Sequence, residues 1–455
     1  MNASPDLEFL RSLETEDSKV FPLESFDEWF QKGIDRHRFK IEQISFSALD
    51  KWGFDQSTGN LQHISGRFFR IEGIFVETNF GNVECWSQPI INQPEVGILG
   101  IIAKKINGVF HFLMQAKMEP GNINMIQLAP TLQATKSNYT RVHQGKLPPY
   151  LEYFRDNPQR KALVDVLQSE QGARFLRKRN RNIIVELPET EQVRDSEDYI
   201  WLTLGQIARL LRRDNVINMD ARTVLSCISY HRQNGQESET GALHDMDEIM
   251  TWFTEMKCRY DLNVEQIPLK YVAEWHQDDN RIYHTTGNYF EVIAARVEAD
   301  NREVLSWTQP LVKPCREGII ALIARSINGI PHFLIQGKVE CGNFDVVEMA
   351  PTVQCLTGDY KKAAPNARPP FLEYVLSAPS EAILLDTMQS EEGGRFYREE
   401  NRNLVILVGD DFPKEIPDNY LWISYTQLKT LIRFNNIVNI QCRCLLSCVG
   451  PDSLF

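Results

Sequence analysis

The chain has 455 residues, of which 42% are hydrophobic and 24% are charged, the balance of a globular protein of roughly two to four domains. The formal net charge of −12 argues against general nucleic-acid binding, because neutralising phosphates requires a basic surface. No run of about 18 apolar residues is present, so no membrane span is expected.

The N-terminal residues are polar and acidic and lack the basic and apolar regions of a signal peptide, so we expect a cytoplasmic protein. Residues 1–25 are predicted to form a loosely held lead-in. A helical segment is predicted to begin at Phe26 and to continue toward Phe39. A similar segment begins at Met246.

A duplication organises the rest of the chain. Residues 107–133 match residues 328–354 without a gap, with 14 of 27 positions identical at an offset of 221 residues. The polar stretch 231–243, rich in Gly, Ser and Glu, is the best candidate for a linker. We therefore predict a first repeat at 26–230 and a second repeat at 244–455.

The centre of each repeat predicts a β-hairpin. In the first repeat Gly97 to Ile106 is a continuous apolar run, which is typical of a buried strand. Asn107-Gly108 favours a type I′ turn, because both of its central residues need positive φ. Residues 109–118 then alternate between apolar and mainly polar side chains, as a return strand does.

Helices are expected later in each repeat. Residues 161 to about 179 and 382 to about 398 are predicted to be helical, each with a Gln-Ser-Glu segment. Two further helices are predicted to begin at the capping boxes Thr203…Gln206 and Ser424…Gln427. Each repeat is therefore predicted to be an α+β domain, a mixed sheet with helices packed on it.

The nine cysteines mostly stand alone inside apolar runs, a pattern typical of buried reduced thiols. Cys442, Cys444 and Cys448 are close together, but no second set of ligands follows at the spacing of a zinc site. We expect no metal site there.

One face of the return strand carries the same functional groups in both repeats. They are His111, Gln115, Lys117 and Glu119 in the first repeat and His332, Gln336, Lys338 and Glu340 in the second. One interpretation is a buried polar ladder that was inherited unchanged. The other is a sheet floor that presents a cation, an acid and hydrogen-bonding groups to a ligand, which we favour because burying four polar groups twice is costly.

Other side chains suit an anionic, ring-containing ligand. Arg174, Arg181, Arg395 and Arg402 could grip phosphate bidentately or lie as surface charges. Trp86, Tyr139, Trp307 and Tyr360 could stack on a base or sugar or belong to the core. Walker A, G-x-G-x-x-G, G-x-S-x-G and H-E-x-x-H motifs are absent, and residues 390–395 match only a fragment of a Nudix box.

Several motifs occur twice: Trp-x-Gln-Pro, Gly-Asn followed by Ala-Pro-Thr-x-Gln, Pro-Pro-(Tyr/Phe)-Leu-Glu-Tyr, Gln-Ser-Glu-x-Gly-x-Arg-Phe and Asn-Arg-Asn. Together they resemble the NDP-hexose 2,3-dehydratase family of deoxysugar biosynthesis, from about Trp29 to Cys448. The resemblance implies two Nudix-like domains, a homodimer, and neither metal nor organic cofactor. It also implies a dTDP-4-keto-6-deoxy-hexose substrate, at one or two sites per subunit, that loses water across C2 and C3.

The hypothesis for the active site rests on one difference between the repeats. Gln127 of the first repeat corresponds to Glu348 of the second, and only a carboxylate can act as a base there. We therefore expect the second repeat to be catalytic, with Glu348 or Glu340 as base, His332 as acid and Lys338 on the O4 enolate. The alternative uses Lys117, Glu119 and His111.

The predicted substrate-binding residues come from both repeats. They are Trp307, Gln336, Asn343, Thr352, Gln354, Tyr360, Arg395 and Arg402, together with Trp86, Lys117, Gln133, Tyr139, Arg174 and Arg181. A protein of another class, a nucleotide-sugar-binding module without catalysis, would use the same residues. Loss of water from the substrate distinguishes the enzyme from the binding module.

Overall fold

The computed structural model describes residues 5–136, 147–155, 160–230, 241–300, 304–355 and 368–450. Their α-helices are α1 (Pro5–Leu13), α2 (Phe26–Arg36), α4 (Leu151–Phe154), α5 (Leu204–Leu211), α6 (Met219–Ser226), α7 (Met246–Arg259), α8 (Leu372–Leu376), α9 (Tyr425–Leu431) and α10 (Ile440–Ser447). Single 3₁₀ turns are η1 (Leu23–Ser25), η2 (Phe46–Ala48), η3 (Leu269–Tyr271) and η6 (Ser380–Ala382). None of these helices is long and apolar enough to cross a membrane.

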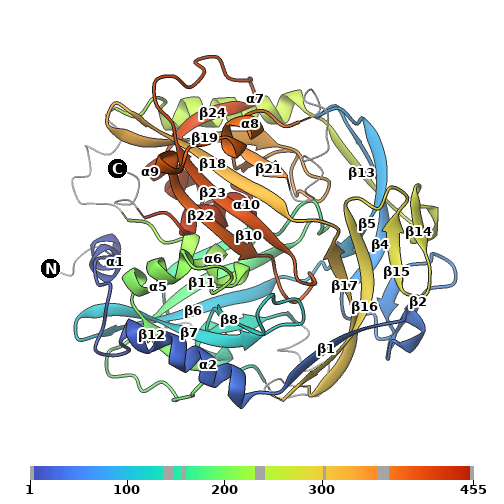
Figure 1. Cartoon of the computed structure of the whole chain (residues 1–455), viewed down its shortest axis with the longest axis horizontal. Coiled ribbons are helices and arrows are strands. Elements are labelled where there is room, and N and C mark those ends of the chain that lie inside the picture. The colour runs from blue at the N-terminus through green and yellow to red at the C-terminus, as the bar shows by residue number, and fades with distance from the viewer. Residues whose placement is uncertain are drawn as a thin grey trace.

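Each repeat builds a seven-stranded mixed sheet, and the two sheets lie one above the other at the left of Figure 1. The first contains β6 (Gly97–Ile106), β7 (Val109–Met118), β8 (Ile126–Ala129), β9 (Leu132–Ala134), β10 (Lys161–Ser169), β11 (Arg179–Leu187) and β12 (Tyr199–Leu202). The second contains β18 (Gly318–Ile327), β19 (Ile330–Lys338), β20 (Glu348–Ala350), β21 (Val353–Cys355), β22 (Ile383–Ser390), β23 (Glu400–Leu407) and β24 (Tyr420–Ser424). The predicted α+β class is confirmed, whereas the Nudix-like relationship stays a prediction.

The predicted hairpin is confirmed. β6 and β7 pair antiparallel, and the turn residues Asn107 and Gly108 have φ of 53° and 76°. Both capping boxes are present as well, at the start of α5 and of α9. The predictions made from local turn and cap chemistry are therefore confirmed in both repeats.

The helices predicted at 161–179 and 382–398 are wrong. These segments begin as the strands β10 and β22, which pair with β11 and β23 at the edges of the main sheets. A β-bulge between Ala162 and Val164 interrupts the alternation of side chains in β10. The bulge hides the two-residue period that identifies a strand in sequence, and pairing with β11 decides the structure.

The two repeats exchange a strand. One five-stranded sheet contains β2 (Trp52–Phe54), β3 (Leu61–His63), β4 (Arg70–Thr78) and β5 (Cys85–Asn92) of the first repeat, with β13 (Leu262–Ile267) of the second. The other contains β14 (Trp275–Gln277), β15 (Arg281–His284), β16 (Phe290–Ala299) and β17 (Ser306–Pro314) of the second repeat, with β1 (Phe39–Ile44) of the first. The repeats are therefore not packed as two separate units.

These two smaller sheets share one core and form the lobe at the right of Figure 1. Leu61 and Ile71 of the first repeat and Ile282 and Val292 of the second belong to the same buried cluster. The largest cluster likewise joins the main sheets of both repeats with α5, α6, α7, α9 and α10. Burial of apolar surface between the repeats is therefore a large part of what stabilises the fold.

The described part of the lead-in, residues 5–25, is not loosely held, so that expectation is wrong. Phe9 and Leu10 of α1 are buried. The Ser12 hydroxyl is fully buried; it donates to the Phe110 carbonyl at 2.7 Å and accepts from the Leu204 amide at 2.9 Å. Most of the predicted linker, residues 231–240, lies outside the described residues.

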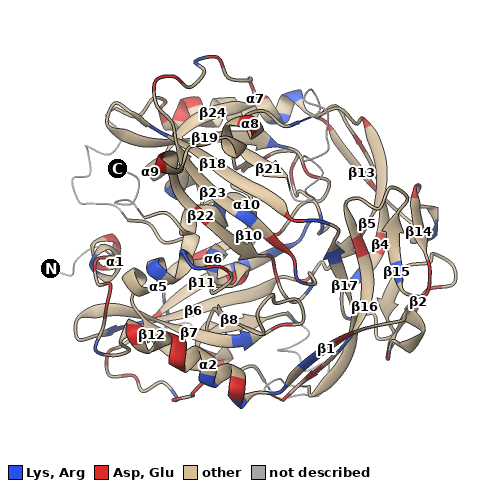
Figure 2. Ribbon diagram, viewed as in Figure 1, with Lys and Arg blue, Asp and Glu red and all other residues tan. Residues whose placement is uncertain are grey.

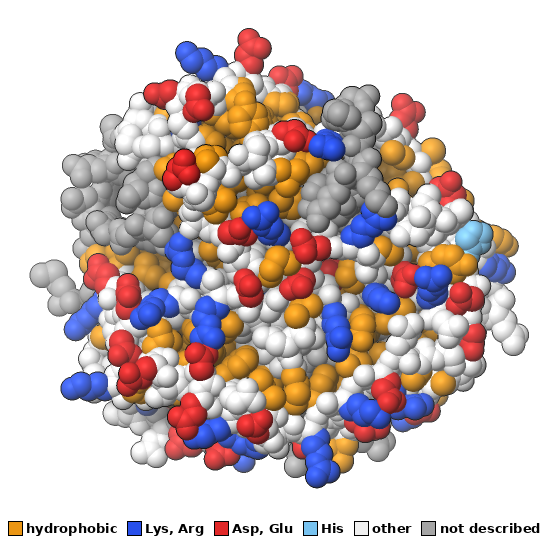
Figure 3. Space-filling model, viewed as in Figure 1, with side chains coloured by type: hydrophobic (Ala, Val, Ile, Leu, Met, Phe, Trp, Pro, Cys, Tyr) orange, Lys and Arg blue, Asp and Glu red, His pale blue; other side chains and the backbone are white. Residues whose placement is uncertain are grey.

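Charged side chains of both signs are distributed over most elements (Figure 2). On the face that Figure 3 shows, acidic and basic groups alternate among apolar and polar ones. No large basic area is visible on that face, in line with the low isoelectric point of about 5.4.

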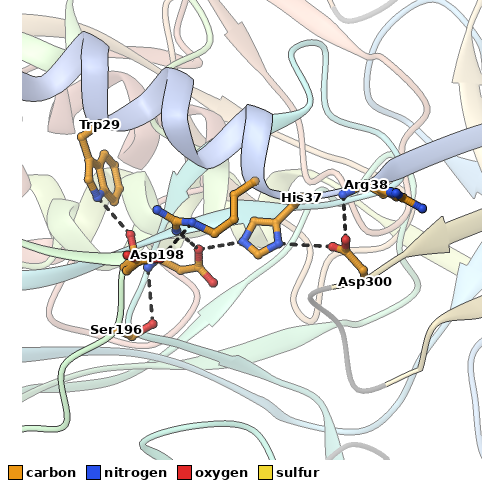
Figure 4. Close-up of polar contacts among 8 residues, drawn as sticks. Trp29, His37, Arg38, Ser196, Asp198 and Asp300 are labelled. Atoms are coloured by element: carbon orange, nitrogen blue, oxygen red, sulfur yellow. Dashed lines mark hydrogen bonds and ion pairs between the residues drawn. The ribbon is translucent and has the colours of Figure 1, made fainter.

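Charged groups fix the point where β1 leaves the first repeat for the sheet of the second (Figure 4). His37, between α2 and β1, lies between Asp198 of the first repeat and Asp300 of the second. Its Nε2 is 2.8 Å from Asp198 Oδ1, and its Nδ1 is 3.2 Å from Asp300 Oδ1. Both ring nitrogens therefore face carboxylate oxygens, one in each repeat.

The equivalent crossing into β13 uses neutral groups. Tyr260 stands where the first crossing has His37, and it packs edge-on against Phe80 at 5.0 Å between ring centroids. Asn79 replaces Asp300 and accepts from the Asp261 amide at 2.9 Å. The first crossing is thus held by an imidazole between two carboxylates, and the second by ring packing and amide hydrogen bonds.

We expect His37→Ala to lower the free energy of unfolding by about 1–3 kcal/mol, because it removes two hydrogen bonds to carboxylates, one of which joins the two repeats. Tyr260→Phe, the control at the other crossing, should change it by less than about 0.5 kcal/mol. Denaturant titration of the two variants measures both values. Equal stability of the two variants would contradict this account of the crossing.

Candidate functional site

Two candidate centres form where the chain after β7 or β19 meets a loop of the other repeat. In the first-repeat centre, the Gly121 amide donates to the Gly393 carbonyl at 2.7 Å, and the Arg398 amide donates to the Gly121 carbonyl at 2.8 Å. Gly342 makes the same two bonds with the loop that follows β10. The residue-119–124 segment therefore lies under loop 391–398, and its counterpart lies under loop 170–177.

The glycines of the repeated Gly-Asn motif are required by this contact. A Cβ on Gly121 would lie 1.5 Å from the Phe396 carbonyl oxygen, and a Cβ on Gly342 would lie 1.8 Å from the Phe175 carbonyl oxygen. No side chain fits at such distances. A motif that sequence reasoning linked to substrate is thus explained by the packing of the two repeats.

The first-repeat centre is built around Glu119, which is 4% exposed just beyond β7. Its Oε1 accepts from Gln133 Nε2 at 2.8 Å, and its Oε2 accepts from Asn218 Nδ2 at 3.3 Å. Lys117 Nζ lies 3.6 Å from Glu119 Oε1. Asn218 also caps α6, so the helix and the sheet hold this carboxylate together.

The second-repeat centre repeats this arrangement around Glu340. Gln354 Nε2 donates to Glu340 Oε1 at 2.9 Å, and Asn439 Nδ2 donates to Gln354 Oε1 at 2.8 Å. Asn439 caps α10. Burial raises the pKa of Glu340 above its ordinary value, partly offset by Lys338 and by Arg174 of the other repeat. Both repeats thus hold their glutamate in a similar arrangement of side chains, and a loop of the other repeat lies over each.

The centres differ in two carboxyl groups that sequence reasoning missed. Asp220 in the first turn of α6 corresponds to Gln441 in α10, and Glu392 in the second-repeat loop corresponds to Gln171 in the first. Both acids belong to the first-repeat centre, where each interacts electrostatically with Glu119. The same offset of 221 residues that revealed Gln127 and Glu348 also reveals these exchanges.

Glu348 occupies a position that an amide fills equally well. The Ser169 hydroxyl donates to Glu348 Oε2 at 2.7 Å, and the Ser390 hydroxyl donates to Gln127 Oε1 at 2.9 Å. Both acceptors are buried. Burial raises the pKa of Glu348 to about 7, although the Ser169 hydrogen bond and the nearby Arg443 oppose the shift.

The structure does not bring the histidines into either centre. His332 lies six residues before Lys338 along β19, roughly 20 Å away at about 3.3 Å per residue. Its Nε2 accepts from the Leu243 amide at 3.0 Å, and its Nδ1 lies 2.9 Å from the Ile330 carbonyl. His111 is likewise engaged by Ser18 at 2.7 Å. The expected single cluster of His332, Lys338 and Glu340 is therefore not formed.

The four arginines divide into two pairs. Arg181 and Arg402 each form a bidentate ion pair with an aspartate on the neighbouring strand, at 2.5–2.9 Å, so they match the surface-charge interpretation. Arg174 is buried with its guanidinium 4.3 Å from the Phe290 ring centroid. Among the described residues, its Nε and Nη2 have no hydrogen-bond partner. Arg395 lies 4.2 Å from the Phe69 ring centroid.

The remaining predicted binding residues lie in several places. Trp86 and Trp307 donate to Gln88 and Gln309, which bind the loops that complete the centres. Thr352 ties β18 to β19 by donating to the Leu334 carbonyl and accepting from the Ile323 amide. Gln336 is buried in β19, and Asn343 is buried beside Gly172. Tyr139 and Tyr360 lie outside the described residues.

Comparison with known proteins identifies the family. A family model described as NDP-hexose 2,3-dehydratase matches the chain twice, at residues 23–228 and 246–449. The chain belongs to the NDP-hexose 2,3-dehydratase family.

Among the described residues, no group of three or more His, Cys, Asp or Glu side chains is arranged to hold a metal ion.

Curated relatives are similar over nearly their whole length. Three of them carry the name dTDP-4-dehydro-6-deoxy-α-D-glucopyranose 2,3-dehydratase. The protein of Saccharopolyspora spinosa is 46% identical over 450 residues, covering 94% of this chain and 91% of the relative. Those of Amycolatopsis orientalis and Streptomyces violaceoruber are each 45% identical, covering 96% and 94% of this chain and 92% and 97% of the relatives. The family resemblance expected from the motifs is confirmed.

Glu348→Gln should not destabilise the fold. Because the folded-state pKa of Glu348 is raised from 4.5 to about 7, the native protein loses stability relative to the unfolded chain as the pH rises from about 4.5 to about 7. The variant lacks this loss, so it should be more stable than wild type above pH 7, by up to about 3 kcal/mol. Unfolding measured at pH 5 and pH 8 tests this, and a variant that is less stable at pH 8 would contradict it.

Proposed function

We propose that the protein is a hydro-lyase that removes water across C2 and C3 of dTDP-4-keto-6-deoxy-D-glucose. The product is the 3,4-diketo-2,6-dideoxy sugar, an early intermediate for deoxysugars of natural products. The names of the three relatives support the substrate. The observation that carries the chemistry is the buried lysine and glutamate 3.6 Å apart, enclosed by a loop of the other repeat.

The reaction needs three kinds of group. The C4 ketone acidifies the hydrogen on C3, so a positioned carboxylate can remove it. The negative charge then moves onto O4, where a nearby cation stabilises the enolate. The C2 hydroxyl leaves as water when an acid protonates it. The resulting enol gains a proton at C2 and loses one at O3, which gives the diketone.

The geometry favours the first-repeat centre for this reaction, the alternative that the sequence left open. Gln133, Asn218 and Lys117 surround the Glu119 carboxylate with donors, an environment that suits a negatively charged base. Glu348, on which the choice of the second repeat rested, fills an acceptor role that Gln127 fills as well.

In this proposal Glu119 is the base that takes the C3 proton, and Lys117 stabilises the enolate oxygen. The second-repeat centre retains the corresponding residues Lys338 and Glu340, and we assign it an auxiliary role without catalysis. We further propose that the protein acts as a cytoplasmic homodimer without an added cofactor, as the family resemblance implied. Light scattering of the purified protein tests the dimer.

Glu119→Gln should lower kcat for water loss at least about 100-fold, because an amide cannot accept the C3 proton. Glu340→Gln, the matched change in the other centre, should stay within about threefold of wild type. Loss of substrate and appearance of the diketo sugar, followed by mass spectrometry, measure both. The reverse order of the two variants would assign catalysis to the second repeat.

Two controls complete this experiment. Glu348→Gln should keep turnover close to wild type, and its inactivity would restore the assignment made from sequence. Wild-type protein that binds the nucleotide sugar, seen as a thermal shift, but releases no water would instead be a nucleotide-sugar-binding module.

A further inference from the structure

Two carboxyl groups approach the base of the first-repeat centre from opposite repeats. Asp220 comes from α6 of the first repeat, and Glu392 comes from the loop of the second repeat that covers the centre. A Cβ on the next residue, Gly393, would lie 3.0 Å from Glu119 Cβ, so this loop lies directly on the base. Asp220 and Glu392 also interact electrostatically with each other.

Each of these two acids has a buried carboxyl oxygen without a hydrogen-bond donor among the described residues. Asp220 is 3% exposed, and within the described residues its Oδ1 has no hydrogen-bond partner. Glu392 Oε1 accepts from the Gly394 amide at 2.9 Å, whereas its buried Oε2 has no partner among the same residues. Burying a carboxylate without donors costs several kcal/mol, so a proton on one of these groups reduces the cost.

The second-repeat centre shows which side chains the fold can accept at the positions of Asp220 and Glu392. Gln441 and Gln171, both buried, stand where Asp220 and Glu392 stand in the first. The fold thus accommodates a buried neutral glutamine at both positions. The paired acids in one centre therefore need an explanation other than packing.

We propose that Glu392 is the general acid of the dehydration and that Asp220 is a positioning residue that holds the proton on it. This inference rests on the proposed function and adds two residues to it. Glu392 is assigned the contact with the leaving hydroxyl because its side chain comes from the covering loop and is less buried than Asp220.

The proton balance closes with these groups. Glu119 takes the C3 proton as the C3–H electrons form the enolate. Protonated Glu392 gives its proton to the C2 oxygen, the C2–O bond breaks, the C2–C3 double bond forms and water leaves. The proton on Glu119 then returns to the carboxyl pair, directly or through water. The neutral enol that remains tautomerises without net uptake of protons.

The electrostatic surroundings agree with this division of roles. Burial and the negative groups Glu119 and Glu170 raise the pKa of Glu392 to about 7, although Arg395 opposes the shift. Burial together with Glu392, Glu170 and Glu119 raises the pKa of Asp220 well above its ordinary value, against Lys117. A proton is therefore held in this pair near neutral pH, where a general acid is useful.

Glu392→Gln separates the two halves of the reaction. It should lower the rate of water loss about 100-fold or more, because Gln cannot donate an acidic proton. Because Glu119 remains, the variant should still exchange the C3 hydrogen of the substrate for deuterium in D₂O, read by NMR of recovered substrate. Glu119→Gln should lose both activities. A Glu392→Gln variant with wild-type water loss, or without C3 exchange, would overturn the assignment.

Asp220→Asn tests the positioning role through pH. In the wild type the pair loses its last proton at high pH, because the Glu392 charge helps to raise the pKa of Asp220. Without Asp220 the pair holds only the proton of Glu392, so the alkaline limb of kcat should move down by on the order of one pH unit. At low pH the variant should approach the wild-type rate. A uniform loss of kcat at every pH, with no displaced limb, would overturn the positioning role.

Controls separate this inference from folding and from the proposed function. Gln441→Asn changes the corresponding position of the other centre and should leave both readouts unchanged. Melting temperatures of the Asp220 and Glu392 variants should equal or exceed that of wild type, because each change removes a poorly paired buried acid. Wild-type protein that releases no water refutes the proposed function itself, whereas active wild type with an active Glu392→Gln variant refutes only the inference.

Discussion

The fold depends on the close approach of two glycines to the backbone of the opposite repeat. Gly121 and Gly342 leave no space for a Cβ, and each is bound through both its amide and its carbonyl. This contact places a loop of one repeat on the polar floor of the other. The exchanged strands β1 and β13 and the apolar clusters shared by the two repeats also hold the repeats together. Neither repeat contains a complete centre by itself.

Shared construction explains why the two centres were free to diverge in a small number of side chains. The floor, its glutamine and its asparagine cap are the same in both, because they connect the sheet to α6 or α10. Groups that only transfer protons contribute little to this framework. Their replacement by amides removes an acid without removing a hydrogen-bonding side chain, which is the difference seen at Asp220, Gln441, Glu392 and Gln171.

Features that depend on nearby residues could be predicted from the sequence. The hairpin at Asn107, the capping boxes, the duplication and the family followed from turn chemistry, cap chemistry and repeated motifs. The strands β10 and β22 were missed because a bulge and edge pairing decide them. The packed lead-in was missed because its partners, such as Phe110 and Leu204, are distant in sequence.

The structure brings together only some of the side chains that the sequence predicted to form the site. Lys117 and Lys338 lie on the expected strands and the two glutamates lie just beyond them, but His332 belongs to the far end of β19. Alternation along a strand indicates which side chains share a face and says nothing of the distance between them. The contact between this loop and the other repeat cannot be read from any periodicity, so the placement of Glu392 beside Glu119 required the structure.

A crystal structure with the dTDP-sugar bound tests the central claim most directly. The account predicts a hexose ring between the first-repeat floor and the loop around Glu392, with C3 within about 3–3.5 Å of a Glu119 carboxylate oxygen. Lys117 should then face O4. A hexose bound with C3 against Glu340 or Glu348, and none beside Glu119, would contradict the assignment of catalysis to the first-repeat centre.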